Sequence, residues 1–556
     1  MKVVIVGGVA GGATAATRLR RLDEHAQITV FERSGYISYA NCGLPYYIGG
    51  VIEDKEELTL QTPESIGKRF RIDMKVHHEV TDINAEKKTV TVHNLDTGKV
   101  YEESYDKLIL SPGARPVMPN LPGIENEKIF TLILKKYTDE HQPKSAVVVG
   151  GGFIGIEVAE NLCELGIDVT LVEAADQLMA PFDRDMASFI HAEIRKNGIH
   201  LMLDTMVEGF ADTDCGIDVK LKDTPTLHTD MVVMAIGVVP ETTLAKEAGL
   251  ELGIKSSIVV NDKMETSIPD IYAVGDAVQI KNFVTDTDTL ISLAGPANKQ
   301  GRIVADNICG GNSHYTGGQG SSVIKIFDIT AAATGINEKM AKSLGIAADK
   351  VILSPMSHAG YYPGGKMMTM KVLFEKESSR ILGAQIVGFD GVDKRIDVLA
   401  TAIRAGMKAY DLAELDLAYA PPYSSAKDPV NMAGYIIENI KNGVVKQWYY
   451  EDEEALPRDG SVTLLDTRTP MEYSMGHADG FINIPVDELR ERLDELDKSK
   501  PVYVICQSGL RSYIASRILM GNGFDAYNFA GGFRFYDAVR NDKALNKKST
   551  PCGMDD

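Results

Sequence analysis

The sequence predicts an α/β protein with several domains, and two observations carry this prediction. A strand, a glycine-rich turn, a helix and a second strand follow one another twice, first from Lys2 and again from Val147. Repeats of this kind are typical of parallel sheets that bind dinucleotides. The length of 556 residues, with 44% hydrophobic and 24% charged residues, suits about three or four soluble domains.

The charge of the chain argues against several classes of partner. A formal net charge of -20 and a pI near 5.1 disfavour general binding to nucleic acid and adhesion to anionic membranes. The first residues run as a strand into a glycine-rich turn, so we expect no signal peptide. The sequence has no run of about 18 apolar residues that could span a bilayer. We therefore expect a cytoplasmic protein that binds neither nucleic acid nor a membrane.

The cysteines are few and widely spaced along the sequence. They form no CxxC pair and no histidine-rich motif, which argues against a zinc site and suits a reducing cytoplasm. We expect no bound metal. The six positions are Cys42, Cys163, Cys215, Cys309, Cys506 and Cys552.

The first glycine-rich turn runs from Gly7 to Gly12 and leads into a predicted helix. The second strand of this unit ends at Glu32, 20 residues after Gly12. An acid at that place binds ribose hydroxyls while the helix N-terminus holds a pyrophosphate. Val9 stands where the usual fingerprint has its second glycine, so an ordinary glycine-rich turn is the alternative.

The second glycine-rich turn fits the fingerprint fully, with Gly150, Gly152 and Gly155 in place. Glu173 follows the next strand, 18 residues after Gly155. A carboxylate there repels a 2′-phosphate, so it favours NADH over NADPH. Further on, a predicted strand closes on Gly275-Asp276, where Asp276 could simply cap the following turn.

Five elements together resemble the flavoprotein disulfide reductases that bind two dinucleotides. They are the two glycine-rich turns, Ser111–Ala114, Ala235–Pro240 and Gly275-Asp276, which occur in that family's order. The resemblance implies that the first unit holds FAD, with Asp276 near the ribityl chain, and that NADH or NADPH delivers hydride from the second. The cofactor-binding residues that it implies are Gly7, Gly8, Gly11, Gly12, Glu32, Arg33, Ser111, Gly113, Gly150, Gly152, Gly155, Glu173, Gly237, Gly275 and Asp276.

Cys42 stands alone in the segment Asn41-Cys42-Gly43-Leu44-Pro45-Tyr46, and the next cysteine is 121 positions away. Although a lone cysteine is usually packing, a disulfide reductase with one cysteine can take its second thiol from the substrate. The segment resembles the single-cysteine branch of coenzyme A-disulfide reductases, NADH oxidases and peroxidases. Peroxidases of this group have a histidine where this chain has Ala10, so peroxide reduction is the weaker interpretation.

Two basic groups flank Cys42 in the sequence. Arg18 and Arg21 are three residues apart on one face of the first helix, and residues 68–71 read Lys-Arg-Phe-Arg. Solvated surface charge is the alternative, but on such an acidic chain the two groups suit a polyanion. The resemblance to coenzyme A-disulfide reductases implies the substrate-binding residues Thr14, Arg18, Arg21, Ser38, Asn41, Arg69, Arg71, Asn298 and Lys427.

The pattern after residue 320 alternates strands with short helices and resembles the family's dimerisation domain. Tyr361 and Tyr419 lie in segments with Pro and Gly, where tyrosines are usually packing. The resemblance implies that they reach the cysteine from the partner subunit, where a phenol can donate a proton to a leaving thiolate. Lys427 would meet the nucleotide end of the substrate. We therefore expect a homodimer.

A second segment with a lone cysteine lies near the end of the chain. A predicted strand at 502–505 delivers Cys506 to a loop whose backbone amides can stabilise a thiolate and then a persulfide. The spacing Cys-x4-Arg from Cys506 to Arg511 makes a smaller ring than the Cys-x5-Arg of phosphatase loops and suits sulfur. With Leu464–Arg468 and Gly476–Pro485, this loop resembles a rhodanese domain. We expect Cys552 in the polar tail to be a free, disordered thiol.

These features predict two Rossmann-like dinucleotide-binding domains, an α+β dimerisation domain and a C-terminal α/β rhodanese domain. The expected borders are 1–115 with 250–320 for FAD, 116–249 for NAD(H), 321–445 for dimerisation, 446–459 for an acidic linker, and 460–556 for rhodanese and tail.

The resemblances imply an enzyme that uses NAD(P)H to reduce coenzyme A persulfide, polysulfide or coenzyme A disulfide. Its expected cofactors and ligands are FAD, NADH or NADPH, and coenzyme A. An NADH oxidase or peroxidase, and a non-catalytic redox-sensing sulfur carrier, are the alternatives. The expected catalytic residues are Cys42, Cys506, Tyr361, Tyr419 and Arg511.

Overall fold

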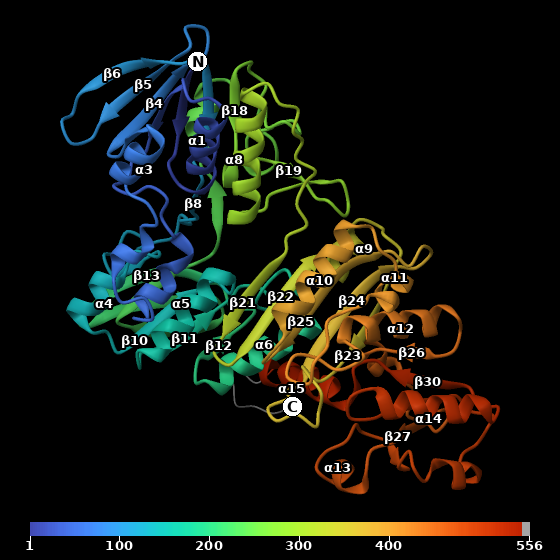
Figure 1. Ribbon diagram of the computed structural model, residues 1–556. Helices are drawn as coiled ribbons and strands as arrows, with labels where there is room; N and C mark the ends of the chain where they lie inside the picture. The colour runs from blue at the N-terminus through green and yellow to red at the C-terminus, as the bar shows by residue number, and fades with distance from the viewer. Residues whose placement is uncertain (548–556) are drawn as a thin grey trace. The chain divides into compact units, whose positions relative to one another are not determined.

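The computed structural model describes residues 1–547, so the prediction for Cys552 lies outside the described residues. The chain divides into two compact units. The first comprises residues 1–172, 207–222 and 226–320, and the second comprises 173–206, 223–225 and the chain from 321 on. Figure 1 labels the elements of both units and colours them along the chain from blue to red.

The first unit contains a parallel sheet of five strands in the order β18-β7-β1-β2-β3. Its central residues Val3, Val4 and Ile5 are fully buried, as expected for a parallel strand covered on both faces. Helices α1 and α8 pack so closely that a Cβ on Gly301 would lie 2.4 Å from the carbonyl oxygen of Gly11. These elements are β1 (Lys2–Val6), α1 (Ala10–Leu22), β2 (Gln27–Phe31), β3 (Asp73–Lys75), β7 (Lys107–Leu110), β18 (Ile271–Ala273) and α8 (Ala294–Ile308).

A second parallel sheet of the first unit has the strand order β11-β10-β16-β9. Helix α5 connects β10 to β11, which makes the second strand–turn–helix–strand repeat. The two repeats therefore fold as the sequence predicts. These elements are β9 (Ile129–Phe130), β10 (Ser145–Val149), α5 (Phe153–Glu164), β11 (Asp168–Val172) and β16 (Met231–Met234).

Smaller antiparallel sheets complete the first unit. One has the order β4-β5-β6, another β13-β14-β15, and β17 pairs with β8 and β20 with β19. The strands are β4 (His78–Asn84), β5 (Thr89–Asn94), β6 (Val100–Ser104), β8 (Ala114–Pro116), β13 (Val207–Thr213), β14 (Gly216–Leu221), β15 (Thr224–Thr229), β17 (Val238–Pro240), β19 (Ile280–Lys281) and β20 (Asp288–Thr289). The short helices are α2 (Leu44–Ile48), α3 (Pro63–Phe70), α4 (Lys135–His141) and α7 (Thr243–Glu247).

The second unit contains an antiparallel sheet in the order β21-β22-β25-β24-β23. Helix α10 packs on β22 and β25, and α12 packs on β23 (Figure 1). The sheet and helices form the α+β domain predicted after residue 320. Its elements are β21 (Ser322–Ile326), β22 (Ile329–Gly335), α9 (Glu338–Ser343), β23 (Ala348–Leu353), β24 (Met368–Glu375), β25 (Ile381–Gly388), α10 (Val392–Arg404), α11 (Ala409–Glu414) and α12 (Pro429–Lys441); α6 (Arg184–Lys196) and β12 (His200–Met202) also belong to this unit.

The last domain is a parallel five-stranded sheet in the order β26-β30-β29-β27-β28. Its first strand, β26, comes from residues that the sequence assigns to a linker. Trp448 in β26 explains the difference, because this side chain is 2% exposed and packs against Phe529 and Phe481. The elements are β26 (Lys446–Trp448), β27 (Thr463–Asp466), α13 (Pro470–Ser474), β28 (Ile482–Asn483), β29 (Val502–Ile505), α14 (Leu510–Gly521), β30 (Ala526–Phe529) and α15 (Gly532–Lys547).

The acidic segment after β26 is fixed to the preceding domain. The Tyr449 hydroxyl donates to the carbonyl oxygen of Lys350 at 2.9 Å, and the Lys350 ammonium pairs with Glu451. Lys350 is buried, while the Glu451 side chain is about half exposed. The segment is therefore a fixed connection between the two sheets of the second unit.

Helix α15 packs on α6 around a buried histidine. His191 Nε2 accepts the backbone N–H of Leu178 at 3.0 Å, so the neutral ring carries its proton on Nδ1, 2.9 Å from the Asp542 carboxylate. Burial lowers the pKa of His191. Burial also opposes ionisation of Asp542, but hydrogen bonds from His191 and Arg195 outweigh it and lower the pKa of Asp542. This network fixes the end of the described chain to the second unit.

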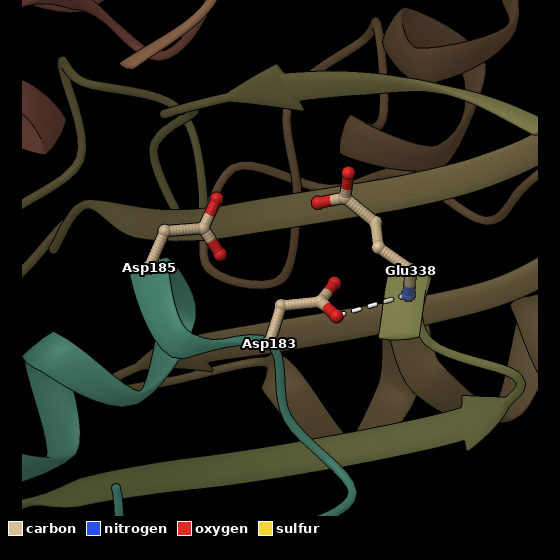
Figure 2. A group of neighbouring side chains, drawn as sticks. All are labelled: Asp183, Asp185 and Glu338. Atoms are coloured by element: carbon tan, nitrogen blue, oxygen red, sulfur yellow. Dashed lines mark hydrogen bonds between the residues drawn. The ribbon is translucent and has the colours of Figure 1, made fainter. Parts of the chain in front are cut away.

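One group of three acidic side chains within residues 1–547 has the spacing of metal ligands: Asp183, Asp185 and Glu338. Figure 2 shows the three carboxyl groups together, with the Glu338 backbone N–H donating to Asp183 at 2.9 Å. The fully buried Lys371 ammonium lies 3.0 Å from Asp183 and 2.9 Å from Asp185, and it also contacts Glu338. Burial alone would lower the pKa of Lys371, but the carboxylates raise it. The cluster is a buried ion-pair network centred on this lysine.

Candidate active sites

The first glycine-rich turn is shaped by close backbone contacts. Gly7 has a φ of +96°, and a Cβ there would lie 2.0 Å from the carbonyl oxygen of Ser111. A Cβ on Gly12 would lie 2.0 Å from the carbonyl oxygen of Gly7. No side chain of the described residues caps the start of α1, so its backbone N–H groups are available to an anionic ligand. The turn and helix can hold a pyrophosphate even with Val9 in the fingerprint.

Glu32 lies beside this turn at the end of β2. Its carboxylate accepts the backbone N–H of Gly8 and that of Ser34, both at 2.9 Å. The side chain is almost fully buried. These contacts fix the acid at the edge of the sheet where a nucleotide ribose would lie.

Asp276 lies at the carboxyl end of β18, and the N–H of Gly275 beside it donates to Gln300 at 2.7 Å. The Asp276 carboxyl has no hydrogen-bond or ion-pair partner within the part of the chain that the structure describes. Burial raises the pKa of this carboxyl. A half-buried carboxyl without a partner is an acceptor for ligand hydroxyls, which fits the ribityl chain of FAD.

In the second glycine-rich turn, two glycines are required by close backbone contacts and a third faces open space. A Cβ on Gly150 would lie 2.4 Å from the Ala235 carbonyl oxygen, and a Cβ on Gly155 would lie 1.8 Å from that of Gly150. A Cβ on Gly152, at the N-cap of α5, would meet no described atom within 4 Å. Protein packing therefore leaves the space above Gly152 for a ligand. Glu173, the first residue after β11, accepts the backbone N–H of Ala175 at 2.8 Å.

Cys42 lies in the short 3-10 helix Asn41–Gly43, directly before α2. The residue is exposed and its thiol is free. Nearby protein atoms partly desolvate the thiol, and together with the Glu157 and Asp276 carboxylates they raise the pKa of Cys42. The structure thus brings Cys42, Asp276 and the helix of the second glycine-rich turn into one neighbourhood.

Glu157 and Tyr46 are site residues that the sequence analysis missed. Helix α2 packs on α5, where a Cβ on Gly49 would lie 2.1 Å from the Asn161 side chain. The Tyr46 hydroxyl donates to Glu157 at 3.4 Å. Burial raises the pKa of Glu157 to about 7 and that of Tyr46 to about 12. The sequence carries no clear signal for Glu157, which is one of three glutamates in α5.

The predicted substrate residues on α1 have partners within the first unit. The Thr14 hydroxyl donates to Asn298 at 2.6 Å, and Arg18 forms an ion pair with Asp306 at 2.7 Å. Asp306 therefore offsets the charge of Arg18, while Arg21 is exposed. Ser38 has a φ of +48°, and Asn41 is exposed beside Cys42.

The two basic groups lie next to each other in the structure. Arg20 of α1, which the sequence analysis did not single out, is 7% exposed. It donates to the carbonyl oxygens of Phe70 at 2.7 Å and Arg71 at 2.9 Å, at the end of α3. Arg69 and Arg71 are themselves exposed. Arg20 therefore joins the helix carrying Arg18 and Arg21 to the second basic group.

Tyr361 and Tyr419 meet in the second unit, with their hydroxyl oxygens 2.5 Å apart. Both side chains are exposed, and the hydrogen bond between them raises the pKa of Tyr419. Arg395 was missed by the sequence analysis although it organises both loops. This buried guanidinium donates to the Ser357 carbonyl at 2.9 Å and to Asp428 at 3.1 Å. Lys427, next to Asp428, is exposed.

The Cys506 loop surrounds a buried sulfur at the N-terminus of α14. The Cys506 Sγ accepts the Gly509 backbone N–H at 3.1 Å and the Ser512 hydroxyl at 3.2 Å. Gly509 has a φ of +99°, and a Cβ on Gly532 would lie 2.6 Å from the backbone nitrogen of Ser508. The loop is a cradle of donors around sulfur.

Arg511 does not contact the sulfur directly. Its guanidinium donates to both oxygens of Glu472, at 2.7 Å each. This pairing lowers the pKa of Glu472 to about 2. Behind the loop, the buried Arg468 pairs with Asp466 at 2.7 Å and stacks 3.8 Å from the ring centre of Phe533. Glu472 and Arg468 thus position the loop, a role that the spacing of Cys506 and Arg511 alone did not reveal.

These domains match known families. Residues 1–301 match the pyridine nucleotide-disulphide oxidoreductase family, 321–429 match its dimerisation domain, and 451–538 match the rhodanese-like domain. The chain therefore belongs to the pyridine nucleotide-disulphide oxidoreductase family. It is an FAD-dependent oxidoreductase of that family with an appended rhodanese-like domain, as the sequence predicts.

Individual relatives cover from 78% to 97% of the chain. A coenzyme A disulfide reductase of Staphylococcus aureus (strain JH9) is 38% identical over 442 residues, 78% of this chain and 99% of the relative. Reduced CoADR-RHD of Bacillus anthracis is 50% identical with a TM-score of 0.95, covering 97% of this chain and 98% of that one. A NAD-dependent persulfide reductase from A. fulgidus is 39% identical with a TM-score of 0.91, covering 96% and 100%. Within residues 1–547 no helix is long and apolar enough to cross a membrane.

Proposed function

We propose that this chain is an NADH-dependent reductase of sulfur carried by coenzyme A, acting on coenzyme A disulfide and on the persulfide or polysulfide. The observation that carries the proposal is the free, exposed Cys42 close to Asp276 and Glu157. Cys42 forms no disulfide within residues 1–547, and the next cysteine in the sequence is 121 positions away, so in this proposal the substrate supplies the resolving thiol. The coenzyme A disulfide reductase and persulfide reductase relatives support the same class of reaction.

Cys42 is the proposed nucleophile. Its thiolate attacks one sulfur of the substrate disulfide, so that a Cys42–sulfur bond forms, the substrate S–S bond breaks and a coenzyme A thiolate leaves. With a persulfide the leaving group is hydrosulfide. The hydroxyl pair of Tyr361 and Tyr419, offered by a second copy of the chain, donates a proton to the leaving thiolate. FAD, when bound, would supply the electron pair of NADH that breaks this mixed disulfide, which releases the remaining coenzyme A as its thiol and returns Cys42 to its thiolate.

The proposed cofactor sites use the two glycine-rich turns. The uncapped start of α1 suits the FAD pyrophosphate, Glu32 suits a ribose, and Asp276 suits the ribityl hydroxyls. Glu173 favours NADH because its carboxylate disfavours a 2′-phosphate. The remaining proposed cofactor contacts are Gly7, Gly8, Gly11, Gly12, Arg33, Ser111, Gly113, Gly150, Gly152, Gly155, Gly237 and Gly275.

The proposed coenzyme A site combines cations with neutral donors. Arg20 brings the basic residues of α1 and of the α3 end together, which provides positive charge for the substrate phosphates. Lys427 approaches from a second copy, so the proposed enzyme is a homodimer. Its widely spaced cysteines suit a reducing compartment, so the proposed location is the cytoplasm. The proposed contacts are Thr14, Arg18, Arg21, Ser38, Asn41, Arg69, Arg71, Asn298 and Lys427.

Cys506 is the proposed carrier of sulfane sulfur. Its thiolate attacks the outer sulfur of a persulfide, a Cys506–sulfur bond forms, and the carrier thiol leaves. The Gly509 N–H and the Ser512 hydroxyl then hold the sulfur in the cradle. Arg511 acts with Glu472 to shape the loop entrance.

Steady-state NADH consumption tests the proposal. Wild type, Cys42→Ser and the control Cys163→Ser are compared with coenzyme A disulfide, coenzyme A persulfide and polysulfide. We expect Cys42→Ser to lose activity with all three substrates and Cys163→Ser to keep it. Retained activity in Cys42→Ser would contradict the central role of this thiol.

Two further measurements separate the alternatives. Rapid oxygen consumption with NADH and no thiol substrate would identify an NADH oxidase. Stopped-flow mixing with NADH tests the non-catalytic sulfur carrier, because such a protein would show no flavin bleaching in the first seconds. The Cys506→Ser variant tests the rhodanese domain, since an accessory domain would leave turnover of the persulfide unchanged.

A further inference from the structure

A second cluster with a nucleophile lies on the antiparallel sheet β13-β14-β15, outside the sites described above. Cys215 occupies the tight turn between β13 and β14 and is exposed. Its Sγ lies 3.6 Å from Nε2 of His228 on β15. The other ring nitrogen of His228, Nδ1, lies 2.9 Å from the Asp218 carboxylate on β14. All three residues belong to the first unit.

The three side chains form the arrangement that activates a nucleophile: a thiol beside an imidazole that a carboxylate orients. Asp218 accepts a hydrogen bond from Nδ1–H of His228, which places the proton of the neutral ring on Nδ1. The lone pair of Nε2 then faces the Cys215 thiol and can take its proton. A thiolate is the reactive form of cysteine, so this arrangement prepares Cys215 for nucleophilic attack.

Gly216 provides the room for this contact. A Cβ at residue 216 would lie 2.9 Å from His228 Nε2 and 2.5 Å from the carbonyl oxygen of Thr229. Any larger residue beside Cys215 would therefore displace the ring from the thiol. Lys128 donates to the Gly216 carbonyl at 2.9 Å and pairs with Asp212 at 2.8 Å, which anchors the turn.

The solvent exposure of Cys215 and His228 suits a reaction with a small molecule in solution. About half of the His228 side chain faces solvent and Cys215 is exposed, so the thiol can meet a dissolved reagent directly. A zinc site would need more ligands than Cys215 and His228 provide. Exchange with a small disulfide needs only an accessible thiolate and a proton acceptor.

We propose that Cys215 is a thiol-exchange site for small-molecule disulfides, with His228 as base and Asp218 as the positioning residue. The Cys215 proton moves to His228 Nε2, and the thiolate attacks one sulfur of the disulfide R–S–S–R. A bond forms between Sγ and that sulfur, the S–S bond breaks, and the leaving thiolate takes the proton from His228. Cys215 is oxidised to a mixed disulfide while the other half of the reagent is reduced to a free thiol.

The site is independent of the reduction proposed for Cys42, because it uses neither FAD nor NADH. Its product is a reversible modification of the nucleotide-binding part of the enzyme. A mixed disulfide at Cys215 breaks the Cys215–His228 contact and places a new group on the β13–β14 turn.

The test uses the full-length, FAD-loaded protein with Cys42, Cys506 and Cys552 replaced by serine, so that Cys215 is the exposed thiol left to react. Reaction with 4,4′-dithiodipyridine is followed by the absorbance of the released thiopyridone. Mass spectrometry of the digested protein assigns the modified cysteine. We expect Cys215 to carry the label, with Cys163 and Cys309 reacting more slowly because they are less exposed.

The variant His228→Gln is expected to lower the rate at Cys215 about tenfold, because glutamine cannot accept the proton of the attacking thiol. Asp218→Asn is expected to lower it less, since the base remains but loses its orientation. The matched control is His25→Gln, an exposed histidine with no cysteine contact. An unchanged rate in His228→Gln, or a thermal destabilisation without a change in rate, would overturn the proposal. Unlike the loss of NADH turnover, this rate does not depend on whether Cys42 is the reductase thiol.

Discussion

Glu157→Gln tests the burial of a carboxyl beside the nucleotide-binding turns. Burial raises the pKa of Glu157 from 4.5 to about 7 in the folded protein. The folded state therefore keeps its proton where the unfolded chain has lost it, and stability falls as pH rises from about 4.5 through about 7. Glutamine cannot ionise, so Glu157→Gln avoids this loss above pH 7.

The expected gain follows from the size of the pKa difference. A difference of this size corresponds to at most about 3 kcal/mol in the free energy of unfolding. Because the side chain is half-buried and water screens part of the effect, we expect about 2 kcal/mol at pH 8. At pH 4.5 both proteins carry a neutral side chain, so we expect almost no difference.

The two units offer separate signals for the measurement. Flavin fluorescence on release of FAD reports the first unit, while Trp448, the one tryptophan of the sequence, reports the second. Urea unfolding at pH 8 and pH 4.5 should shift only the flavin signal, and only at pH 8. Glu164→Gln, at an exposed position of the same helix, is the matched control. An equal gain at both pH values, or none at pH 8, would refute the argument.

Three further changes test other parts of the molecule. Lys371→Met leaves three carboxylates around a buried apolar group. It should lower the free energy of unfolding of the second unit by about 3–5 kcal/mol, measured by Trp448 fluorescence. An unchanged unfolding midpoint would contradict the ion-pair network. Glu472→Gln removes one of two charge-assisted contacts to Arg511. It should slow sulfur transfer to cyanide several-fold, while NADH consumption with coenzyme A disulfide stays constant. An equal loss of both activities would count against a role confined to the Cys506 loop. Tyr419→Phe removes the hydroxyl that is hydrogen-bonded to Tyr361. It should lower kcat about 10²-fold with little change in KM. A change in KM alone would indicate a role in substrate binding instead of proton donation.

The glycine-rich turns could be predicted because their chemistry is local. Gly12 and Gly155 are each required by a backbone contact within the same turn, with Gly7 and Gly150 respectively. The spacing of the glycines along the sequence carries that signal, although Gly7 and Gly150 also approach Ser111 and Ala235 far along the chain. The cradle around Cys506 is local in the same way, since Gly509 and Ser512 follow it directly.

The positioning residues could not be predicted because their partners are far away in the sequence. Arg395 joins loops at Ser357 and Asp428, and Glu472 meets an arginine 39 residues later. A single sequence contains no signal for such pairings. Glu157 was missed for a different reason, since its unusual property is its burial and not its spacing.

The strand β26 has a consequence for how the two halves of the second unit can be separated. Residues 446–448 complete the sheet of the rhodanese-like domain, and Trp448 fills its core. A fragment that begins at residue 460 would lack an edge strand and expose Phe529 and Phe481 to water. An independently folding rhodanese-like fragment must therefore begin before Lys446, directly after the last helix of the dimerisation domain. The two domains share no free hinge, and a reductase that lost this domain would have to end at about the same residue.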